Sequence, residues 1–421
     1  MSAASAVDPE RVIADLRELA AASGGEHAGA KRLAWSPDWS AAREWLLGQL
    51  EAIGGLEVDR DEAGNLWATL AGDGSVEGFV IVGSHIDAVP SGGWLDGCLG
   101  LLTALEVVRT LAESAAPPPV TVKLVDWADE EGARFGRSLV GSSAVAGTLD
   151  PDDVGGLLDA EGTTLRDAMA SVGVDLDGAS AATARLEGAR AYLELHIEQG
   201  PVLLDTGRLA CAVSGTVGDE RYLITFSGQS AHAGSTPMHL RRDTLAAAAA
   251  AALEIRAVGL RHEGVTTVGA INSKPAVITA IAGESEMMLD LRHLDADTLA
   301  TMLAECRKAC DDAAAAFDCG VAARRVFGAT PTPFHPKLVA IATAATGGGP
   351  AIPSGPLHDA TEIGRIVPTV MIFAQSDPPI SHTEVEDSPL EALRTAIAAY
   401  GTTVGETLAL VAAGGLDGAS A

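Results

Sequence analysis

Seven side chains that can bind a metal ion or move a proton lie close to short apolar runs of this chain. These residues are His85, Asp87, Asp96, Glu130, Glu131, His196 and His382. The apolar runs that precede or contain them are typical of buried strands. Because open α/β sheets place ligand sites at the carboxyl ends of strands, we expect these side chains to meet at one edge of a sheet. Histidine and carboxylate ligands suit a borderline divalent cation such as Zn²⁺, with Mn²⁺ or Co²⁺ as alternatives.

The loop that carries three of these residues, 83–100, reads GSHIDAVPSGGWLDGCLG. The run 79–82 before it predicts a strand, and residues 99–102 begin a helical pattern. Glycine and proline bend the loop, while the strand and the helix hold the ligands in place. A second apolar run, 120–125, leads directly into the acids of DWADEEG. This pattern is typical of a hydrolase that depends on a metal ion.

The composition limits the class of partner. The chain has 421 residues, of which 47% are apolar, so we expect one large or two medium domains. Its 28 basic and 57 acidic residues give a net charge of −29, which argues against nucleic acid or an anionic membrane as partner. Five scattered cysteines without a Cys-x-x-Cys pair predict free thiols and a cytoplasmic location. We expect neither a signal peptide nor a membrane-spanning segment.

The order of the expected elements indicates two domains. Alternating strands and helices in 1–213 and 329–421 predict an α/β domain with a mainly parallel sheet between helices. Residues 214–328 interrupt it with a strand–helix–strand–strand–helix–strand pattern, which predicts a ferredoxin-like α+β insert. The expected strands of the insert are 221–226, 265–271, 286–292 and 320–327, and its expected helices are 239–258 and 296–317.

Six motifs of this chain resemble one enzyme family. They are GSHIDAVPSGGWLDGCLG, DEEGARFG, HIEQGPVL, GQSAHAGSTPM, DLRH and ISH. They resemble the two-metal amidohydrolases of the carboxypeptidase G and aminoacylase type. The closest resemblance is to the hydantoinase/carbamoylase branch, which holds N-carbamoyl-L-amino-acid hydrolases, β-ureidopropionase and allantoate amidohydrolase. It covers about residues 10 to 410, and HIEQG separates this branch from the dipeptidases.

The resemblance implies a metallopeptidase-like catalytic domain that holds two divalent metal ions per subunit, zinc first, with manganese, cobalt or nickel as alternatives. Asp96 would bridge the two ions. His85 and His196 would complete one site, and Glu131 and His382 the other. Asp87 would orient His85, and Glu130 would be the general base beside a metal-activated water.

The resemblance also implies that the insert is a lid that forms a homodimer and contributes to substrate binding. His232 would reach across the dimer and polarise the scissile carbonyl, and Arg292 would bind the substrate carboxylate. The implied substrate-binding residues are Gln199, His232, Thr279, Arg292, Leu357 and His358, the last followed by Asp359.

Three positions depart from the pattern of the family. Thr279 stands where the family usually has asparagine, and a proline-glycine turn is missing after it. Leu357 replaces a glycine before the His-Asp pair, and Pro379 replaces a glycine before ISH. A threonine offers one hydroxyl where an amide offers both a donor and an acceptor group. The metal ligands are therefore intact while the substrate pocket differs.

These observations predict a hydrolase of a linear amide or ureido C–N bond. We expect its substrate to be a small molecule of the N-carbamoyl-amino-acid, ureidopropionate or allantoate type, with a carboxylate. Glu130 would take a proton from water and pass it to the leaving nitrogen. The alternatives are an N-acyl-amino-acid deacylase or exopeptidase-like hydrolase, and a catalytically silent binding protein stabilised by its metals.

Overall fold

The structure, a computed structural model, describes residues 6–24 and 29–416 and divides into two compact units. The first unit comprises the described residues up to Gly215 and those from Phe334 onward. The second unit is Thr216–Pro333. The sequence placed these two boundaries after residues 213 and 328.

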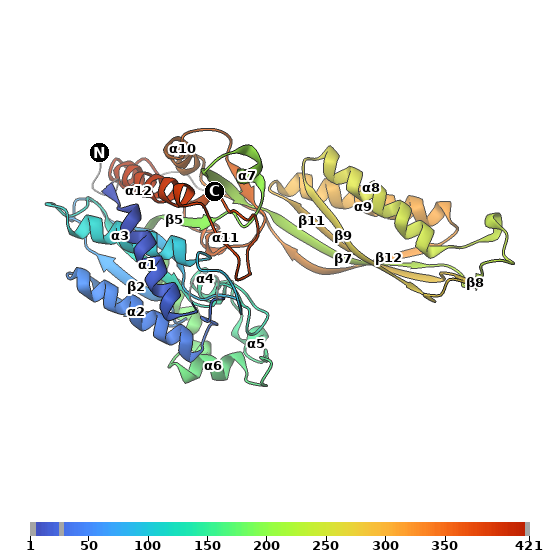
Figure 1. Cartoon of the computed structure of the whole chain (residues 1–421), viewed down its shortest axis with the longest axis horizontal. Helices are drawn as coiled ribbons and strands as arrows, with labels where there is room; N and C mark the ends of the chain where they lie inside the picture. Colours follow the sequence, from blue (N-terminus) through green and yellow to red (C-terminus); the bar gives the residue numbers. More distant parts are fainter. Residues whose placement is uncertain (1–5, 25–28, 417–421) are drawn as a thin grey trace. The chain divides into compact units, whose positions relative to one another are not determined.

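A mixed, mainly parallel sheet forms the centre of the first unit (Figure 1). Its strands lie in the order β1-β2-β4-β3-β5-β15-β6, and β14 pairs with β6. The neighbours β4, β3, β5 and β15 run parallel, whereas the β1–β2, β2–β4 and β15–β6 pairs are antiparallel. Their bounds are β1 Glu57–Arg60, β2 Leu66–Leu70, β3 Phe79–His85, β4 Thr121–Trp127, β5 Ala189–Ile197, β6 Ala210–Thr216, β14 Ile352–Ser354 and β15 Thr369–Ala374. The expected α/β class is confirmed.

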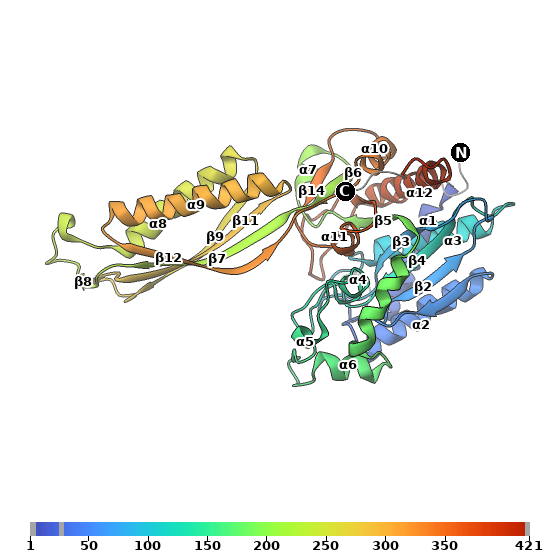
Figure 2. The same ribbon diagram turned by 180° about the vertical axis from the view of Figure 1, so that it is seen from behind.

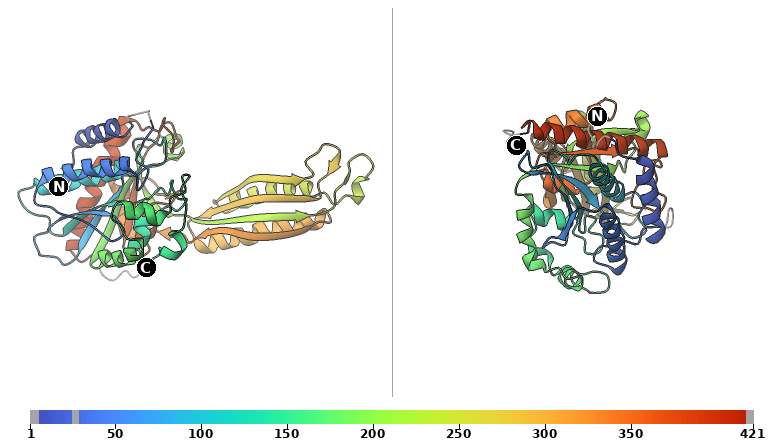
Figure 3. Two further views of the ribbon diagram at one scale, coloured as in Figure 1. Left: turned by 90° about the horizontal axis from the view of Figure 1, so that it is seen from below. Right: turned by 90° about the vertical axis from the view of Figure 1, so that its left-hand side faces the viewer.

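Helices cover both faces of this sheet, as the right-hand view of Figure 3 shows. Helices α3 and α12 pack against the parallel strands β3, β5 and β15, whose side chains are buried except at the start of β5. Asp8 and Ser36 cap the first two helices, each followed by a proline that suits the first helical turn. The helices are α1 Pro9–Ala22, α2 Pro37–Ile53, α3 Cys98–Ala112, α4 Val140–Val145, α5 Pro151–Val154, α6 Leu165–Ser171, the 3₁₀ helix η2 Leu176–Leu186, α7 Val202–Thr206, α10 Pro336–Ala345, α11 Asp359–Ile363 and α12 Leu390–Ala412.

The second unit is a four-stranded antiparallel sheet with two helices on one face (Figure 2). The strand order is β12-β7-β11-β9, which is the ferredoxin-like arrangement that the sequence predicted. Met287, Leu289 and Leu291 face the helices and are buried, while Asp290 lies on the other face. The elements are β7 Gly218–Ser227, β8 Ala231–His232, the 3₁₀ helix η3 Met238–Leu240, α8 Thr244–Arg261, β9 Val265–Lys274, β10 Ala280–Ile281, β11 Glu284–His293, α9 Ala296–Ala316, β12 Gly320–Ala329 and β13 Thr332–Pro333.

One helix of the second unit begins later than expected. The sequence predicted a helix over 239–258, but α8 begins at Thr244. The Asp243 side chain accepts a hydrogen bond from the Ala246 N–H and so fixes the first turn. Within the described ranges, no helix is long and apolar enough to cross a membrane.

Candidate metal centre

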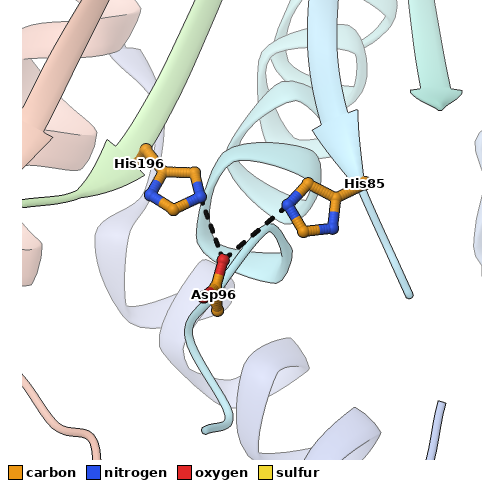
Figure 4. Close-up of side chains that lie close together, drawn as sticks. All are labelled: His85, Asp96 and His196. Atoms are coloured by element: carbon orange, nitrogen blue, oxygen red, sulfur yellow. Dashed lines mark ion pairs between the residues drawn. The ribbon is translucent and has the colours of Figure 1, made fainter. Parts of the chain in front are cut away.

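Asp96 stands between two groups of candidate metal ligands. Its Oδ1 atom lies 3.0 Å from His196 Nε2 and 3.7 Å from His85 Nε2 (Figure 4). Its Oδ2 atom lies 3.4 Å from His382 Nε2, which is itself 3.3 Å from Glu131 Oε2. In each group the ligand atoms all lie within 4.8 Å of one another. The two groups therefore share Asp96, with one carboxylate oxygen facing each.

Strand ends and backbone carbonyls orient the two histidines of the first group. His85 ends β3 and His196 lies near the end of β5, two parallel neighbours in the sheet. His85 Nδ1 donates to the Asp87 carbonyl oxygen at 3.1 Å, and His196 Nδ1 donates to the Ile197 carbonyl oxygen at 2.9 Å. Because a carbonyl can only accept, Nδ1 carries the proton of the neutral ring, and in that form Nε2 is the lone-pair atom that faces Asp96.

The loop before α3 packs directly under His85. Gly97 has φ +65, and a Cβ atom there would lie 2.4 Å from the His85 ring. Only glycine satisfies both the left-handed backbone and this close approach. The glycine thus lets the loop bring Asp96 beneath the histidine.

The turn after β4 presents the two adjacent glutamates. The Asp87 carboxylate accepts from the backbone N–H groups of Glu130 and Glu131, each at 3.2 Å. The same carboxylate lies 3.6 Å from His85 Nδ1, which is too far for a hydrogen bond. Asp87 therefore bonds His85 through its backbone carbonyl, and its carboxylate bonds the turn that carries the two glutamates. Asp129 has φ +57, and its carboxylate accepts from the Trp35 indole at 2.7 Å. This buried turn fixes where the two glutamate side chains begin.

Burial and mutual charge shift the pKa of the five candidate ligands. Burial alone would raise the pKa of Asp96, but the neighbouring histidines, His196 first, hold it well below its usual range. Burial would lower the pKa of His85, yet the nearby carboxylates, Glu130 first, raise it well above its usual range. Burial raises the pKa of Glu131 to about 8, and the hydrogen bond to Asp96 raises that of His382 to about 9. In the absence of a cation, His85, Glu131 and His382 therefore hold protons at neutral pH, whereas Asp96 is ionised.

The donor set fits divalent cations. Imidazole nitrogens and carboxylate oxygens are the ligands that Zn²⁺ and related ions prefer. His85 Nε2 is buried and has no hydrogen-bond partner within the described part of the chain. A buried polar atom without a partner is costly, and a cation between this nitrogen and Asp96 would satisfy it. The residues that would hold a metal are therefore already in place.

Comparison with known proteins identifies the family of this chain. Residues 81–406 match Peptidase family M20/M25/M40. The chain belongs to this family. It is 35% identical to allantoate amidohydrolase of Escherichia coli over 85% of this chain and 88% of that enzyme. It is 34% identical to N-carbamoyl-L-amino acid amidohydrolase of Geobacillus stearothermophilus over 91% of this chain and 95% of that enzyme.

A solved structure places the chain within one branch of the M20/M25/M40 family. An amidase of the hydantoinase/carbamoylase family from Burkholderia multivorans superimposes with a TM-score of 0.85 and 32% identity. The match covers 96% of this chain and 98% of that structure. The resemblance read from the sequence motifs is thus confirmed. The expected enzyme class, a hydrolase of linear amide C–N bonds, is confirmed as well.

Two of the residues that were predicted to bind substrate, Gln199 and His358, contact the candidate metal ligands of this chain. Gln199 Nε2 donates to Asp96 Oδ2 at 2.8 Å, and Gln199 Oε1 is buried without a partner among the described residues. The His358 ring lies tilted against the His196 ring, with 4.4 Å between the ring centroids, and its Nε2 atom bonds the Ser354 hydroxyl at 3.0 Å. Burial holds the pKa of His358 well below its usual range, so this ring is neutral. Leu357, just before it, is half-buried.

The remaining substrate residues predicted from the motifs lie in the second unit. His232 pairs with Ala280 between β8 and β10, and the Thr279 carbonyl accepts from the Ala233 N–H at 2.9 Å. The structure therefore brings Thr279 close to His232. Arg292 donates to both carboxylate oxygens of Asp290, at 2.9 and 3.2 Å. The guanidinium is already held by one carboxylate of the same strand.

Two polar residues at the centre escaped the sequence prediction. The Ser381 hydroxyl lies 3.1 Å from Asp96 Oδ2 and also donates to Glu386 Oε2. Glu386 is fully buried. Ser381 could have been found in the sequence because it directly precedes His382. No such signal marks Glu386, which lies in the acidic run Thr-Glu-Val-Glu-Asp, a pattern typical of a solvated loop.

Proposed function

We propose that this chain hydrolyses a ureido or amide C–N bond of a small carboxylate-bearing molecule, with two divalent cations in each subunit. The observation that carries the proposal is Asp96, whose two oxygens face separate ligand groups. A carboxylate shared in this way is the arrangement of a two-metal hydrolase. We propose zinc as the first candidate cation, with manganese, cobalt or nickel as alternatives.

Glu130 is the proposed general base. When bound, the cations would acidify a water molecule and polarise the scissile carbonyl. Glu130 belongs to neither ligand group, yet its Oε2 atom lies 3.8 Å from His85 Nε2. Burial raises the pKa of Glu130 well above its usual range, which favours a group that accepts a proton and releases it again. Glu130 would take the proton of the water and deliver it to the leaving nitrogen.

The proposed substrate class is a ureido acid. The two named relatives act on allantoate and on N-carbamoyl-L-amino acids, which both carry a ureido group and a carboxylate. Arg292 would bind that carboxylate, because a guanidinium matches its geometry. Gln199, Thr279, Leu357 and His358 would line the pocket.

His232 is the proposed donor to the carbonyl oxygen of the substrate. Its Nδ1 atom accepts from the N–H groups of Gly234 and Ser235, both at 3.1 Å. In the neutral ring the proton therefore sits on Nε2, and the side chain is exposed. An exposed Nε2–H can stabilise the negative charge that develops on a carbonyl oxygen.

We further propose a homodimer that forms through the second unit, so that His232 serves the site of the partner subunit. Strand β9 is an edge of its sheet, and Val265 on it is 57% exposed. Leu253 and Leu260 on α8 are 75% and 67% exposed. Exposed apolar side chains beside an unpaired strand edge are typical of an interface. The cytoplasmic location stays a prediction and is compatible with five free cysteines.

A substrate panel tests the proposal. N-carbamoyl amino acids, allantoate, N-acetyl amino acids and dipeptides are each incubated with the protein loaded with Zn²⁺, Mn²⁺, Co²⁺ or Ni²⁺. We expect ammonia release from the ureido compounds and little hydrolysis of the others. Cleavage restricted to N-acetyl compounds or dipeptides would favour a deacylase or exopeptidase. No cleavage in any loaded form would favour a binding protein.

A further inference from the structure

Glu386 is a buried acid in the loop between β15 and α12. Its side chain has no solvent exposure, and its carboxylate accepts hydrogen bonds from three donors. Oε1 accepts from the backbone N–H groups of Leu95 and Asp96, at 3.3 and 3.1 Å. Oε2 accepts from the Ser381 hydroxyl. Because a buried carboxylate is stable only when its oxygens are bonded, these contacts fix its position.

The three donors belong to two segments that each carry a metal ligand. Leu95 and Asp96 are 291 and 290 positions from Glu386 in the sequence and include the shared ligand. Ser381 directly precedes His382, which belongs to the second ligand group alone. Glu386 thus connects the segment of the shared ligand to the segment of a ligand specific to one cation.

Ser381 extends this connection to the carboxylate of Asp96. Its hydroxyl lies 3.1 Å from Asp96 Oδ2, the oxygen that faces His382 Nε2 at 3.4 Å. Gln199 Nε2 reaches both Asp96 Oδ2 and the Ser381 hydroxyl, at 2.8 and 3.2 Å. Glu386, Ser381 and Gln199 therefore determine together where Oδ2 points.

The loop before Asp96 is shaped around Glu386. A Cβ atom at Gly93 would lie 2.0 Å from Glu386 Oε1 and 2.5 Å from Glu386 Cβ. No side chain fits there, so the loop can approach Glu386 only because residue 93 is glycine. This steric fit is independent of the hydrogen bonds and indicates the same close contact.

Among the three candidate histidine ligands, His382 is the one that the central sheet does not hold in place. Its side chain is 52% exposed, and its backbone has φ +60, a conformation that few residues other than glycine adopt. His85 and His196, by contrast, lie on buried strands of the central sheet.

We propose that Glu386 is a positioning residue that sets the distance between Asp96 and His382 and thereby the affinity of the second cation site. This inference rests on the proposed two-cation function. It predicts that the loss of Glu386 weakens the Glu131–His382 site while the His85–His196 site keeps its cation.

Manganese binding by Glu386→Ala tests this inference. Mn²⁺ is titrated into the metal-free protein and followed by calorimetry and by electron paramagnetic resonance, which separates coupled ion pairs from single ions. We expect wild type to bind two coupled ions and Glu386→Ala to bind the second ion at least tenfold more weakly. Glu386→Gln should recover most of this loss, because its amide oxygen still accepts from both backbone N–H groups.

Amide exchange supplies a readout that does not depend on activity. In the metal-free protein the N–H groups of Leu95 and Asp96 should exchange faster in Glu386→Ala than in wild type, because they lose their acceptor. The matched control is Glu384→Ala, which removes an exposed acid from the same loop and should leave both measurements unchanged. If Glu386→Ala does not fold, Ser381→Ala replaces it and should weaken the second site alone.

The outcomes separate this inference from the proposed function. Two unchanged affinities in Glu386→Ala, or an equal loss at both sites, would overturn the positioning role and leave the two-cation function intact. A wild-type protein that binds a single Mn²⁺ ion would overturn the two-cation proposal itself.

Discussion

Replacement of Glu130 by glutamine removes the proposed base and leaves the shape of the centre intact. The variant keeps a side chain of the same size in a position that is 7% exposed. A positioned general base contributes about 10²- to 10⁴-fold to a rate, or roughly 3–5 kcal/mol of barrier. Since Glu130 belongs to neither ligand group, the variant should still bind its cations. We therefore expect kcat to fall by about two to four decades with an unchanged metal content.

The assay combines ammonia release from an N-carbamoyl amino acid with elemental analysis of the same sample. The matched control is the adjacent Glu131→Gln, which alters a ligand and should lower the metal content by about one ion per chain. A Glu130→Gln protein within tenfold of wild-type activity would refute the assignment of the base. A Glu130→Gln protein that has lost a cation would show that Glu130 is a ligand.

Three further predictions concern protons, substrate and dimer. At pH 7 a cation must displace protons from His382 and Glu131, whose pKa values are about 9 and 8. The affinity of this site for a cation, measured by calorimetry, should therefore rise with pH up to about 9. An affinity that falls as the pH rises would contradict this prediction. Arg292→Lys should raise KM for carboxylated substrates by about ten- to a hundredfold, because the two-pronged hydrogen bond is lost; an equal effect on analogues without a carboxylate would argue against the assignment. Inactive His232→Ala and Glu130→Gln chains, once mixed, should regain about a quarter of wild-type activity, since half of the dimers contain one intact site; verified heterodimers without activity would exclude the role across the dimer.

The candidate metal ligands could be located because strand ends are visible in a sequence, and the resemblance to the family then separated them from the proposed base. Apolar runs mark β3, β4, β5 and β15, and polar side chains mark the points where the chain leaves the sheet. The topology then brings His85, Glu131, His196 and His382 to Asp96. The ferredoxin-like order of the second unit was equally readable from its alternating pattern.

The supporting contacts could not be predicted, because they depend on packing between distant segments. Glu386 lies in an acidic run that looks solvated, and its burial follows from contact with a loop 290 positions away. Asp87 bonds His85 through its carbonyl and not its carboxylate, which residue types alone do not reveal. The start of α8 at Thr244 was missed because Asp243 competes as a cap within a helix-forming stretch.

The position of bound cations is the most direct test of a centre built on one shared carboxylate. Crystals grown with Zn²⁺ can be measured by anomalous diffraction at the zinc edge. We expect two peaks per chain, one beside His85 and His196 and the other beside Glu131 and His382, both in contact with Asp96. A single peak, or two peaks of which one does not contact Asp96, would contradict it.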